Sequence, residues 1–341
     1  VALGQVGAAP RALLQAEGKR FSELWLADTS VDDFAEACDF IPLEPLPRIT
    51  PEQLRSASKE YAGRSAVSVD GFHMRHFNSL CDGALRVLSC ILAICEVTSS
   101  LPLQIRLVML AMLPKPMGGL RPIGVFTSSY GIWGKIRRQY ALEWEESHMR
   151  SFFGGYGFKS ASDVVWRQTL RSEKSTRRGD VAASVLWDLY KFYELIDLEA
   201  LASRCIEEGF PKVIAQLCIN TYKAMRFINI AGYIDGPYRA IRGVIAGCSM
   251  ATTFVRIYYI RSFSSIHFYP SISLDLYIDG IGLIATGKFN DVLRGLKHGT
   301  AAVFKVVVGE LHCEVAPDKA GVIASCSRLC KLLQAWLGTY A

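Results

Sequence analysis

The alternation of hydrophobic and polar positions along the chain predicts a mixture of helices and strands. Hydrophobic residues recur every three or four positions in four stretches, which indicates amphipathic helices at 83–97, 132–153, 160–175 and 198–208. Short apolar runs indicate strands at 107–113, 182–189, 227–230, 273–278, 281–286 and 303–308. The two kinds of element follow one another without regular alternation, so the pattern predicts an α+β fold rather than a doubly wound sheet.

The stretch ITPEQLRSAS carries the signals of a helix start. Thr50 is a good N-cap, Pro51 suits the first helical position, and Gln53 stands where a capping box needs its third residue. Before it, residues 1–50 are first Ala-rich and then Pro-rich, which is typical of an extension joined by an irregular linker. We therefore expect an N-terminal extension and linker over 1–54, with the first domain beginning at residue 55.

The composition narrows the class of protein. Half of the 341 residues are hydrophobic, which allows a substantial core, and because the chain begins at Val1 we interpret it as part of a longer protein. The N-terminus lacks a basic lead before an apolar run, and the apolar region 87–113 is interrupted by Glu96 and Arg106, so we expect neither secretion nor a membrane span. Ten cysteines without a CxxC pair indicate reduced thiols rather than a zinc site. The expected location is intracellular, either nuclear or cytoplasmic.

The net charge of +6 is concentrated in one window of the chain. Between Lys135 and Arg178 there are ten Lys or Arg and five Asp or Glu, so this window alone carries +5. Aromatic residues interleave with these charges, and a basic surface with aromatic rings suits a polyanion such as nucleic acid. The alternative is an ordinary solvated helix face that has no nucleic-acid role.

Two aspartates stand at the ends of expected strands. Asp188 follows the apolar run AASVLW, and Asp279 lies in a tight turn within LYIDGIGL. A strand end and a hairpin tip hold side chains rigidly, and two carboxylates held close together are suitable ligands for the divalent ions of phosphoryl transfer. The alternative is that Asp188 caps a turn and that Asp279 and Gly280 form an Asp-Gly hairpin turn.

Six segments, two of which contain Asp188 and Asp279, resemble in their order the motifs of one polymerase family. They are LPKPMGGLRPIGVFTSSYGIWGKIRRQ (113–139), FGGYGFKSASDVV (153–165), VLWDLYKFYELIDLEAL (185–201), RGVIAGCSMATTFVRIYY (242–259), LYIDGIGL (276–283) and CEVAPDKAGVIAS (313–325). Together they resemble the polymerase domain of reverse transcriptases, most closely that of non-LTR retrotransposons and their group II intron-like relatives. SVDGFHMRHF (68–77) is similar to the element that precedes the fingers in this family.

The resemblance implies a fold and an activity. The fold is a right-hand polymerase with fingers over 55–180 and a palm with an antiparallel sheet over 181–341; residues 205–240 are a possible addition to the fingers, and the thumb is absent or incomplete. The activity is that of an RNA-directed DNA polymerase that uses an RNA template, a DNA primer and deoxynucleoside triphosphates. The implied cofactor is Mg²⁺ or Mn²⁺, with Asp188 and Asp279 as the ligands of two metal ions.

The same resemblance implies roles for other residues. Lys319 would protonate the departing pyrophosphate, and Tyr193 would exclude ribonucleotides by a clash with their 2′-hydroxyl. Lys115 and Arg121, on opposite arms of a hairpin, would hold the triphosphate, since both side chains suit phosphate oxygens. The nucleotide-binding set also includes Ala246 and Gly247, and the template-binding set is Arg242, Gly243, Gly157 and Phe158.

The sequence departs from the family pattern at its centre. Where the family has a second aspartate after Asp279, this chain has Gly280, so two of three expected carboxylates are present. Asp275 does not replace the missing acid, because four strand residues put it ~13 Å from Asp279; Glu194 stays open as a contributor.

Three functions are therefore compatible with the sequence. The first is a retroelement RNA-directed DNA polymerase whose activity Gly280 impairs or leaves intact. The second is a catalytically inactive nucleic-acid-binding module of the same fold. The third is a structural or interaction protein.

Overall fold

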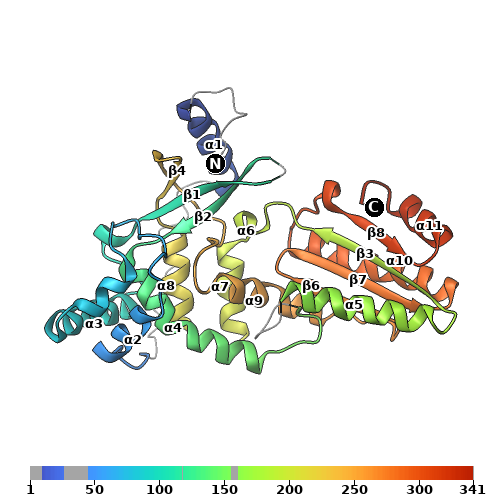
Figure 1. Ribbon diagram of the computed structural model, residues 1–341, viewed down its shortest axis with the longest axis horizontal. Helices are drawn as coiled ribbons and strands as arrows, with labels where there is room; N and C mark the ends of the chain where they lie inside the picture. The colour runs from blue at the N-terminus through green and yellow to red at the C-terminus, as the bar shows by residue number, and fades with distance from the viewer. Residues whose placement is uncertain (1–9, 27–44, 117, 155–159, 341) are drawn as a thin grey trace. The chain divides into compact units, whose positions relative to one another are not determined.

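The chain folds into two compact units, and each unit is made of two separate stretches of the sequence. The computed structural model describes residues 10–26, 45–116, 118–154 and 160–340. One unit comprises Val1–Ala141 and Tyr193–Phe254, and the other comprises Leu142–Phe192 and Val255–Ala341. Each unit is built on a four-stranded sheet (Figure 1). The chain is thus an α+β protein, as the pattern of elements predicts, while the domain boundaries drawn from the sequence stay predictions.

The sheet of the first unit is mixed, with the strand order β2-β1-β4-β5. β1 (Val108–Pro114) pairs antiparallel with β2 (Leu120–Val125) and parallel with β4 (Arg226–Ile230), and β4 pairs antiparallel with β5 (Tyr233–Tyr238). A parallel pair needs a long crossover, and helical chain supplies it between β1 and β4. The helices that belong wholly to this unit are α1 (Pro10–Trp25), α2 (Pro51–Lys59), α3 (Asp82–Val97), α7 (Leu198–Glu207) and α8 (Lys212–Tyr222), with 3₁₀ turns at Met74–Ser79 and Leu103–Ile105.

Local signals in the sequence account for where these elements begin and turn. Thr50 caps α2, and the reciprocal bonds between Thr50 and Gln53 form the predicted capping box. β1 and β2 are joined by a hairpin in which Gly118 and Gly119 have φ of 92° and 80°, a backbone conformation that favours glycine.

A buried ion pair explains why the apolar region 87–113 contains an acid. Glu96, 5% exposed, accepts hydrogen bonds from Arg137 Nε at 2.6 Å and Arg137 Nη2 at 2.8 Å, and from Trp133 Nε1 at 2.7 Å. Burying a carboxylate is costly unless it is paired and hydrogen-bonded, and here both conditions are met. No helix of the described residues is long and apolar enough to cross a membrane.

The sheet of the second unit is entirely antiparallel, with the strand order β6-β7-β3-β8. The strands are β3 (Val181–Asp188), β6 (Ile272–Tyr277), β7 (Gly280–Gly287) and β8 (Gly321–Ala324). The central strands β3 and β7 carry continuous buried runs, which require cover on both faces, and α5 (Ala161–Thr176) and α10 (Phe289–Phe304) both pack against them (Figure 1).

The remaining elements complete this unit or belong to both units. α11 (Ser327–Leu337) follows β8, with 3₁₀ turns at Pro317–Lys319 and Gly338–Tyr340. The unit boundaries fall inside α4 (Ser128–Ser147), the short α6 (Phe192–Leu195) and α9 (Ala251–Ser264). The nine cysteines of the described residues are free thiols, and five of them are buried.

One predicted strand is wrong. The run 303–308 is helical, because α10 continues to Phe304 and a π-helical turn follows at Lys305–Glu310. Its β-branched valines are typical of a strand, yet Val303, Val306 and Val307 are buried at helical spacing while Val308 is half exposed. The segment is therefore helical because of where its side chains pack, although its residue types favour a strand.

Candidate active site

Asp188 and Asp279 meet at one end of the second sheet because the strands that carry them are partners. β3 ends at Asp188, and its antiparallel register with β7 sets Asp188 opposite Gly280. Beyond the last ladder pair, the backbone N–H of Leu189 donates to the carbonyl of Asp279 at 3.1 Å. The pairing of β3 with β7 therefore brings the backbones of the two aspartates together at this end of the sheet.

The hairpin that carries Asp279 turns one residue earlier than an Asp-Gly pattern indicates. Tyr277 pairs with Gly280, so the two loop residues are Ile278 and Asp279, and Gly280 is already the first residue of β7. Ile278 has φ of 57°, in a region that β-branched residues rarely adopt. Strained backbone of this kind persists where surrounding structure fixes it and is frequent at functional sites. Asp279 therefore stands at the tip of a constrained two-residue loop.

Lys319 is the third charged group at this end of the sheet. The backbone N–H of Ala316 donates to the carbonyl of Asp188 at 2.9 Å, which ties the segment before Lys319 to the end of β3. Lys319 Nζ donates to the carboxylate of Asp188. This hydrogen bond, together with the charges of Asp188, Asp279 and Asp318, raises the pKa of Lys319 above its ordinary value. The lysine is therefore a cation at neutral pH and balances Asp188.

The donor set fits the protein's share of a magnesium site. Mg²⁺ in proteins is usually held by one or two carboxylates together with substrate phosphates and water, and Asp188 and Asp279 supply two carboxylates. Within the described residues no cluster of three or more His, Cys, Asp or Glu side chains is placed to hold a metal. The two aspartates thus match one such ion only in the type and number of their carboxylates.

Position 280 can take a side chain if the carbonyl of Tyr277 shifts slightly. A Cβ at Gly280 would meet only the carbonyl of Tyr277, at 3.3 Å, and Gly280 is not among the residues with positive φ. Its strand position opposite Asp188 would put a new carboxylate next to the existing one, since facing residues have Cβ atoms about 5 Å apart.

Asp275 has a structural partner instead of a metal. It is 3% exposed, its carboxylate accepts a hydrogen bond from Arg167, and Gln168 Nε2 donates to it at 3.2 Å. Both partners lie on α5, so Asp275 ties that helix to β6. Glu194, the other acid considered, belongs to the first unit, where its charge acts on Arg226.

The residues predicted to bind the nucleotide lie in the first unit. Lys115 and Arg121 stand on the two arms of the β1–β2 hairpin, as predicted, with Arg121 paired to Leu113 and the N–H of Lys115 bonded to the carbonyl of Gly119 at 2.9 Å. Arg121 is exposed and Lys115 is half-buried. Both side chains are thus near the hairpin end, where a ligand can reach them.

The glycines around residues 243–247 are required by contacts inside the unit. Gly243 has φ of 93°, and its N–H donates to the carbonyl of Ile196 at 2.8 Å. Gly247 has φ of 110°, and a Cβ there would lie 2.6 Å from the carbonyl of Gly124. The carbonyl of Ala246 accepts from Gly124 N–H at 2.6 Å. Close approach of this loop to β2, rather than to a ligand alone, thus explains the glycines.

A small recess gathers several of the predicted residues. Tyr193 and Ala246 line it together with Glu194, Arg226 and Trp25, and its volume of ≈ 20 Å³ is room for about one water molecule. Trp25 was not predicted as a site residue, because it lies in a stretch interpreted as an extension. Arg226 could have been noticed, because it is a charged residue at the start of the apolar strand RFINI. Gly157 and Phe158 lie outside the described residues.

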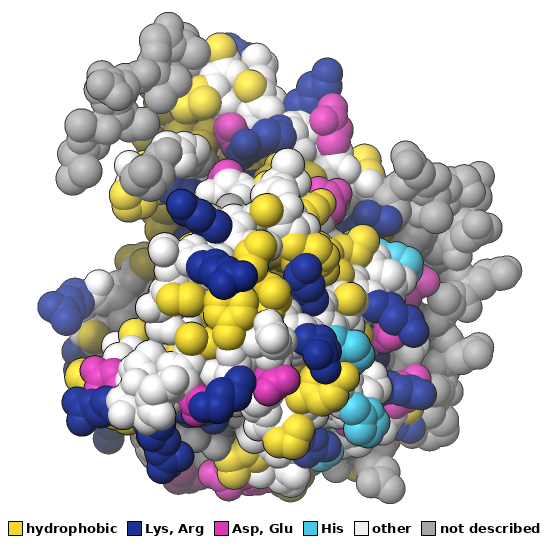
Figure 2. All heavy atoms as spheres, turned by 90° about the vertical axis from the view of Figure 1, so that its right-hand side faces the viewer, with side chains coloured by type: hydrophobic (Ala, Val, Ile, Leu, Met, Phe, Trp, Pro, Cys, Tyr) yellow, Lys and Arg dark blue, Asp and Glu magenta, His cyan; other side chains and the backbone are white. Residues whose placement is uncertain are grey.

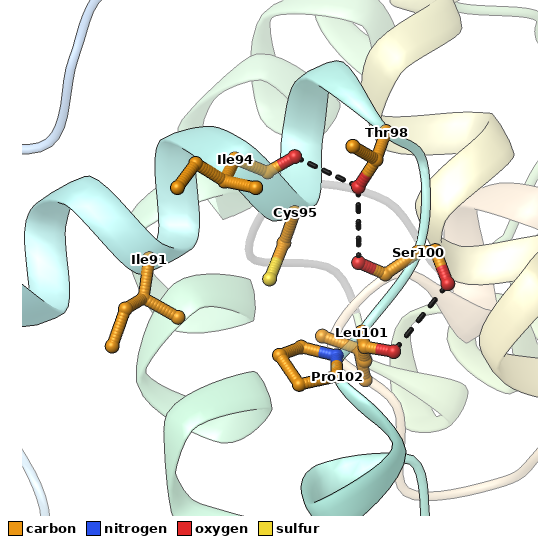
Figure 3. A pocket seen from close by; sticks show the side chains of 7 residues that line it. All are labelled: Ile91, Ile94, Cys95, Thr98, Ser100, Leu101 and Pro102. Atoms are coloured by element: carbon orange, nitrogen blue, oxygen red, sulfur yellow. Dashed lines mark hydrogen bonds between the residues drawn. The ribbon is translucent and has the colours of Figure 1, made fainter.

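A larger hollow in the first unit is lined without any charged side chain. It has a volume of ≈ 350 Å³ and lies between the C-terminal half of α3 and the segment after it (Figure 3). Its lining consists of Ile91, Ile94, Cys95, Thr98, Ser100, Leu101 and Pro102, without a carboxylate, lysine, arginine or histidine. The hollow is apolar and separate from every predicted site residue.

The basic window of the sequence is only in part a basic surface. Arg137 is buried against Glu96, Lys135 pairs with Glu60 at 2.8 Å, and Arg167 pairs with Asp275. Exposed basic side chains at the C-terminal end of α5 are Lys174, Arg177 and Arg178, of which Arg177 pairs with Glu173 at 3.7 Å. On the face of the molecule in Figure 2, lysine and arginine side chains are spread among hydrophobic ones.

Comparisons with known proteins bear on the fold. No family model and no curated protein matches the sequence. Among solved structures, telomerase from Candida tropicalis in complex with a TWJ fragment of telomeric RNA matches with a TM-score of 0.50 and 14% identity, over 65% of this chain and 41% of that one. Apo telomerase from the same organism, truncated from its C-terminal domain, matches with a TM-score of 0.49 and 16% identity, over 65% and 51%. The chain thus spans about half or less of these proteins, and at this identity the likeness shows that it shares the reverse-transcriptase-like fold of telomerase.

Proposed function

We propose that the chain is the polymerase domain of a retroelement reverse transcriptase, an RNA-directed DNA polymerase of the non-LTR or group II intron-like type. The observation that carries the proposal is the meeting of Asp188, Asp279 and Lys319 at one end of an antiparallel sheet. The reverse-transcriptase-like fold and the order of the six sequence segments support it. The first unit would then correspond to the fingers and the second to the palm.

Each site residue has a task in this proposal. Asp188 and Asp279 hold Mg²⁺ or Mn²⁺, and the bound ion supplies charge neutralisation at the reacting phosphates. Lys115 and Arg121 bind the triphosphate of a deoxynucleotide, and Tyr193 excludes a 2′-hydroxyl. Lys319, held as a cation beside Asp188, is placed to give a proton to the departing pyrophosphate. RNA template and DNA primer are the proposed partners.

Two observations favour a second candidate, a nucleic-acid-binding module without catalysis. Gly280 leaves the site one carboxylate short of the family pattern. Lys319 is bonded to Asp188, so a metal ion has to compete with the lysine for that carboxylate. Both features weaken metal binding without affecting the fold that holds nucleic acid.

Primer extension on an RNA template tests the proposal. The wild type is compared with Gly280→Asp and, as a control of equal size, Gly280→Asn, in the presence of Mg²⁺ or Mn²⁺. We expect Gly280→Asp to extend faster by about 100-fold, the order of loss that imperfect positioning of reacting groups produces. Asp188→Ala in the Gly280→Asp background should abolish extension.

Each outcome separates the candidates. Extension by the wild type establishes a working polymerase, and extension by Gly280→Asp alone establishes a polymerase fold that Gly280 has silenced. If neither extends while the wild type still binds RNA, the binding module is the correct function. Extension that survives loss of Asp188 would contradict the assigned site.

A further inference from the structure

Helix α1 is bonded through its last residue to the turn that carries Arg242 and Gly243. The carbonyl of Trp25 accepts hydrogen bonds from the N–H of Ile241 at 3.0 Å and of Arg242 at 3.3 Å. α1 also packs against β4 and β5 (Figure 1). A segment of the N-terminal extension therefore fixes the backbone directly before Gly243.

The side chain of Trp25 covers a buried arginine that grips the same turn. Arg226 is 2% exposed, and its Nη2 donates to the carbonyls of Tyr222, Arg242 and Gly243, each at 2.9 Å. Its Cζ lies 4.8 Å from the centroid of the Trp25 ring, a cation–π contact. Burial lowers the pKa of Arg226 to about 9, so the side chain is still charged at neutral pH. The turn is thus held from two sides, by the backbone of Trp25 and by Arg226.

Close packing fixes where α1 lies. A Cβ at Gly18 would collide with Oη of Tyr238, whose hydroxyl donates to Asp235. The ring of Tyr238 also lies 6.4 Å from that of Trp25. Glycine at position 18 is therefore a condition for α1 to reach β5 and for Trp25 to reach the turn.

The same two residues line the recess beside the candidate nucleotide residues. Trp25 and Arg226 share its wall with Tyr193, Glu194 and Ala246. Within the described residues, Trp25 Nε1 and Arg226 Nε are buried without a hydrogen-bond partner. Two unused donors at one recess leave capacity for an acceptor oxygen there.

We propose that Trp25 and Arg226 are positioning residues, which hold the Arg242–Gly243 turn in the geometry that binds a primer–template duplex. The N-terminal helix is thereby a working part of the site and does more than stabilise the first unit. The inference rests on the proposed function, because that function gives the turn and the recess their ligands.

The test displaces α1 in the full chain and measures binding. Gly18→Val forces α1 away from Tyr238, and Ala16→Val adds the same side chain at an exposed position of the same helix as a control. Trp25→Ala removes the ring over Arg226, while Trp25→Phe keeps an aromatic ring there. The dissociation constant for a duplex of RNA template and DNA primer is measured by fluorescence anisotropy, below the unfolding temperature of every variant.

We expect Gly18→Val and Trp25→Ala to weaken duplex binding by about tenfold, as misplacement of a binding element does. Ala16→Val should bind as the wild type does, and Trp25→Phe should bind more tightly than Trp25→Ala because it keeps an aromatic ring over Arg226. Amide hydrogen exchange should rise at Ile241 and Arg242 in Gly18→Val but not in Ala16→Val, which shows that the turn has been released in a folded protein. Rescue by Trp25→Phe separates positioning from a general loss of stability.

Other outcomes overturn the inference. Equal binding by all four variants would leave α1 without a role in the site, even where exchange at Ile241 rises. Tighter binding by Gly18→Val would mean that α1 blocks the recess. Failure of the wild type itself to bind the duplex is seen before any variant is compared, and it would overturn the proposed function.

Discussion

Gly280 is the residue at which the site departs from the three-carboxylate pattern that the sequence resembles. It is the first residue of β7 and faces Asp188 across the ladder, and a side chain there would need only a small shift of the Tyr277 carbonyl. Asp188 and Asp279 are placed by the fold whether or not position 280 carries an acid. What the glycine removes is negative charge, and with it the affinity for a cation that could replace Lys319 at Asp188.

Gly280→Asp should therefore change how stability depends on metal. Without divalent ions the variant should be less stable than Gly280→Asn by about 1 kcal/mol, because like charges that face each other across a ladder repel. With Mn²⁺ the order should reverse, since an ion that binds only the folded state stabilises it. Thermal unfolding of both variants with and without Mn²⁺ measures the difference. A metal-induced rise in Tm that is equal for Asp and Asn would show that a carboxylate at position 280 does not contribute to metal binding.

At the scale of elements, the sequence predicts what local patterns control and misses what distant contacts control. The capping box at Thr50, the hairpin at Gly118 and the strand that ends at Asp188 are all present, because each depends on neighbouring residues alone. The run 303–308 became helical, since its place in the core was decided by packing. The bond of Trp25 to residues 241 and 242 joins segments more than 200 positions apart, and no periodicity reports such a contact.

Asp275 shows the same limit inside a single strand. It follows an apolar position in LDLYIDGIGL as Asp279 does, yet one acid is a buried partner of α5 and the other stands at a hairpin tip. The difference depends on α5, a helix about a hundred residues earlier, which supplies Arg167 and Gln168. Distance along the strand excluded Asp275 from the metal site, but the sequence did not reveal its partners.

Loss of Asp275 should consequently affect stability and leave the site intact. Asp275→Ala removes the acceptor of Arg167 and Gln168 and should lower the free energy of unfolding by about 2 kcal/mol, because Arg167 is partly exposed and can turn to solvent. The double variant Asp275→Leu with Arg167→Met removes both charges and should recover much of that loss. Urea unfolding measures the stability, and metal-dependent thermal shifts report on the site. A change in metal affinity after Asp275→Ala would contradict the separation of the two acids.

At the scale of the whole molecule, net charge and surface charge differ. The +5 carried by residues 135–178 does not all reach solvent, because Arg137 is buried against Glu96 and Arg167 is paired with the buried Asp275. A polyanion senses the charge that is left exposed, which is concentrated at Lys174, Arg177 and Arg178. The C-terminal end of α5 is therefore the part of the window that should contact phosphates.

Binding of single-stranded RNA should depend on salt in proportion to these contacts. Neutralising Lys174, Arg177 and Arg178 together by Gln should reduce the slope of log affinity against log salt by roughly 2, because each lost phosphate contact contributes about 0.7 for a single strand. A control with Gln at Lys59, Arg64 and Arg86 removes the same charge from exposed positions outside the window and should leave the slope nearly unchanged. Anisotropy titrations at several salt concentrations give both slopes. Equal slopes for the two triple variants would mean that RNA senses only the net charge of the protein. The third function considered from the sequence, in which the basic window has no nucleic-acid role, would then apply to this surface.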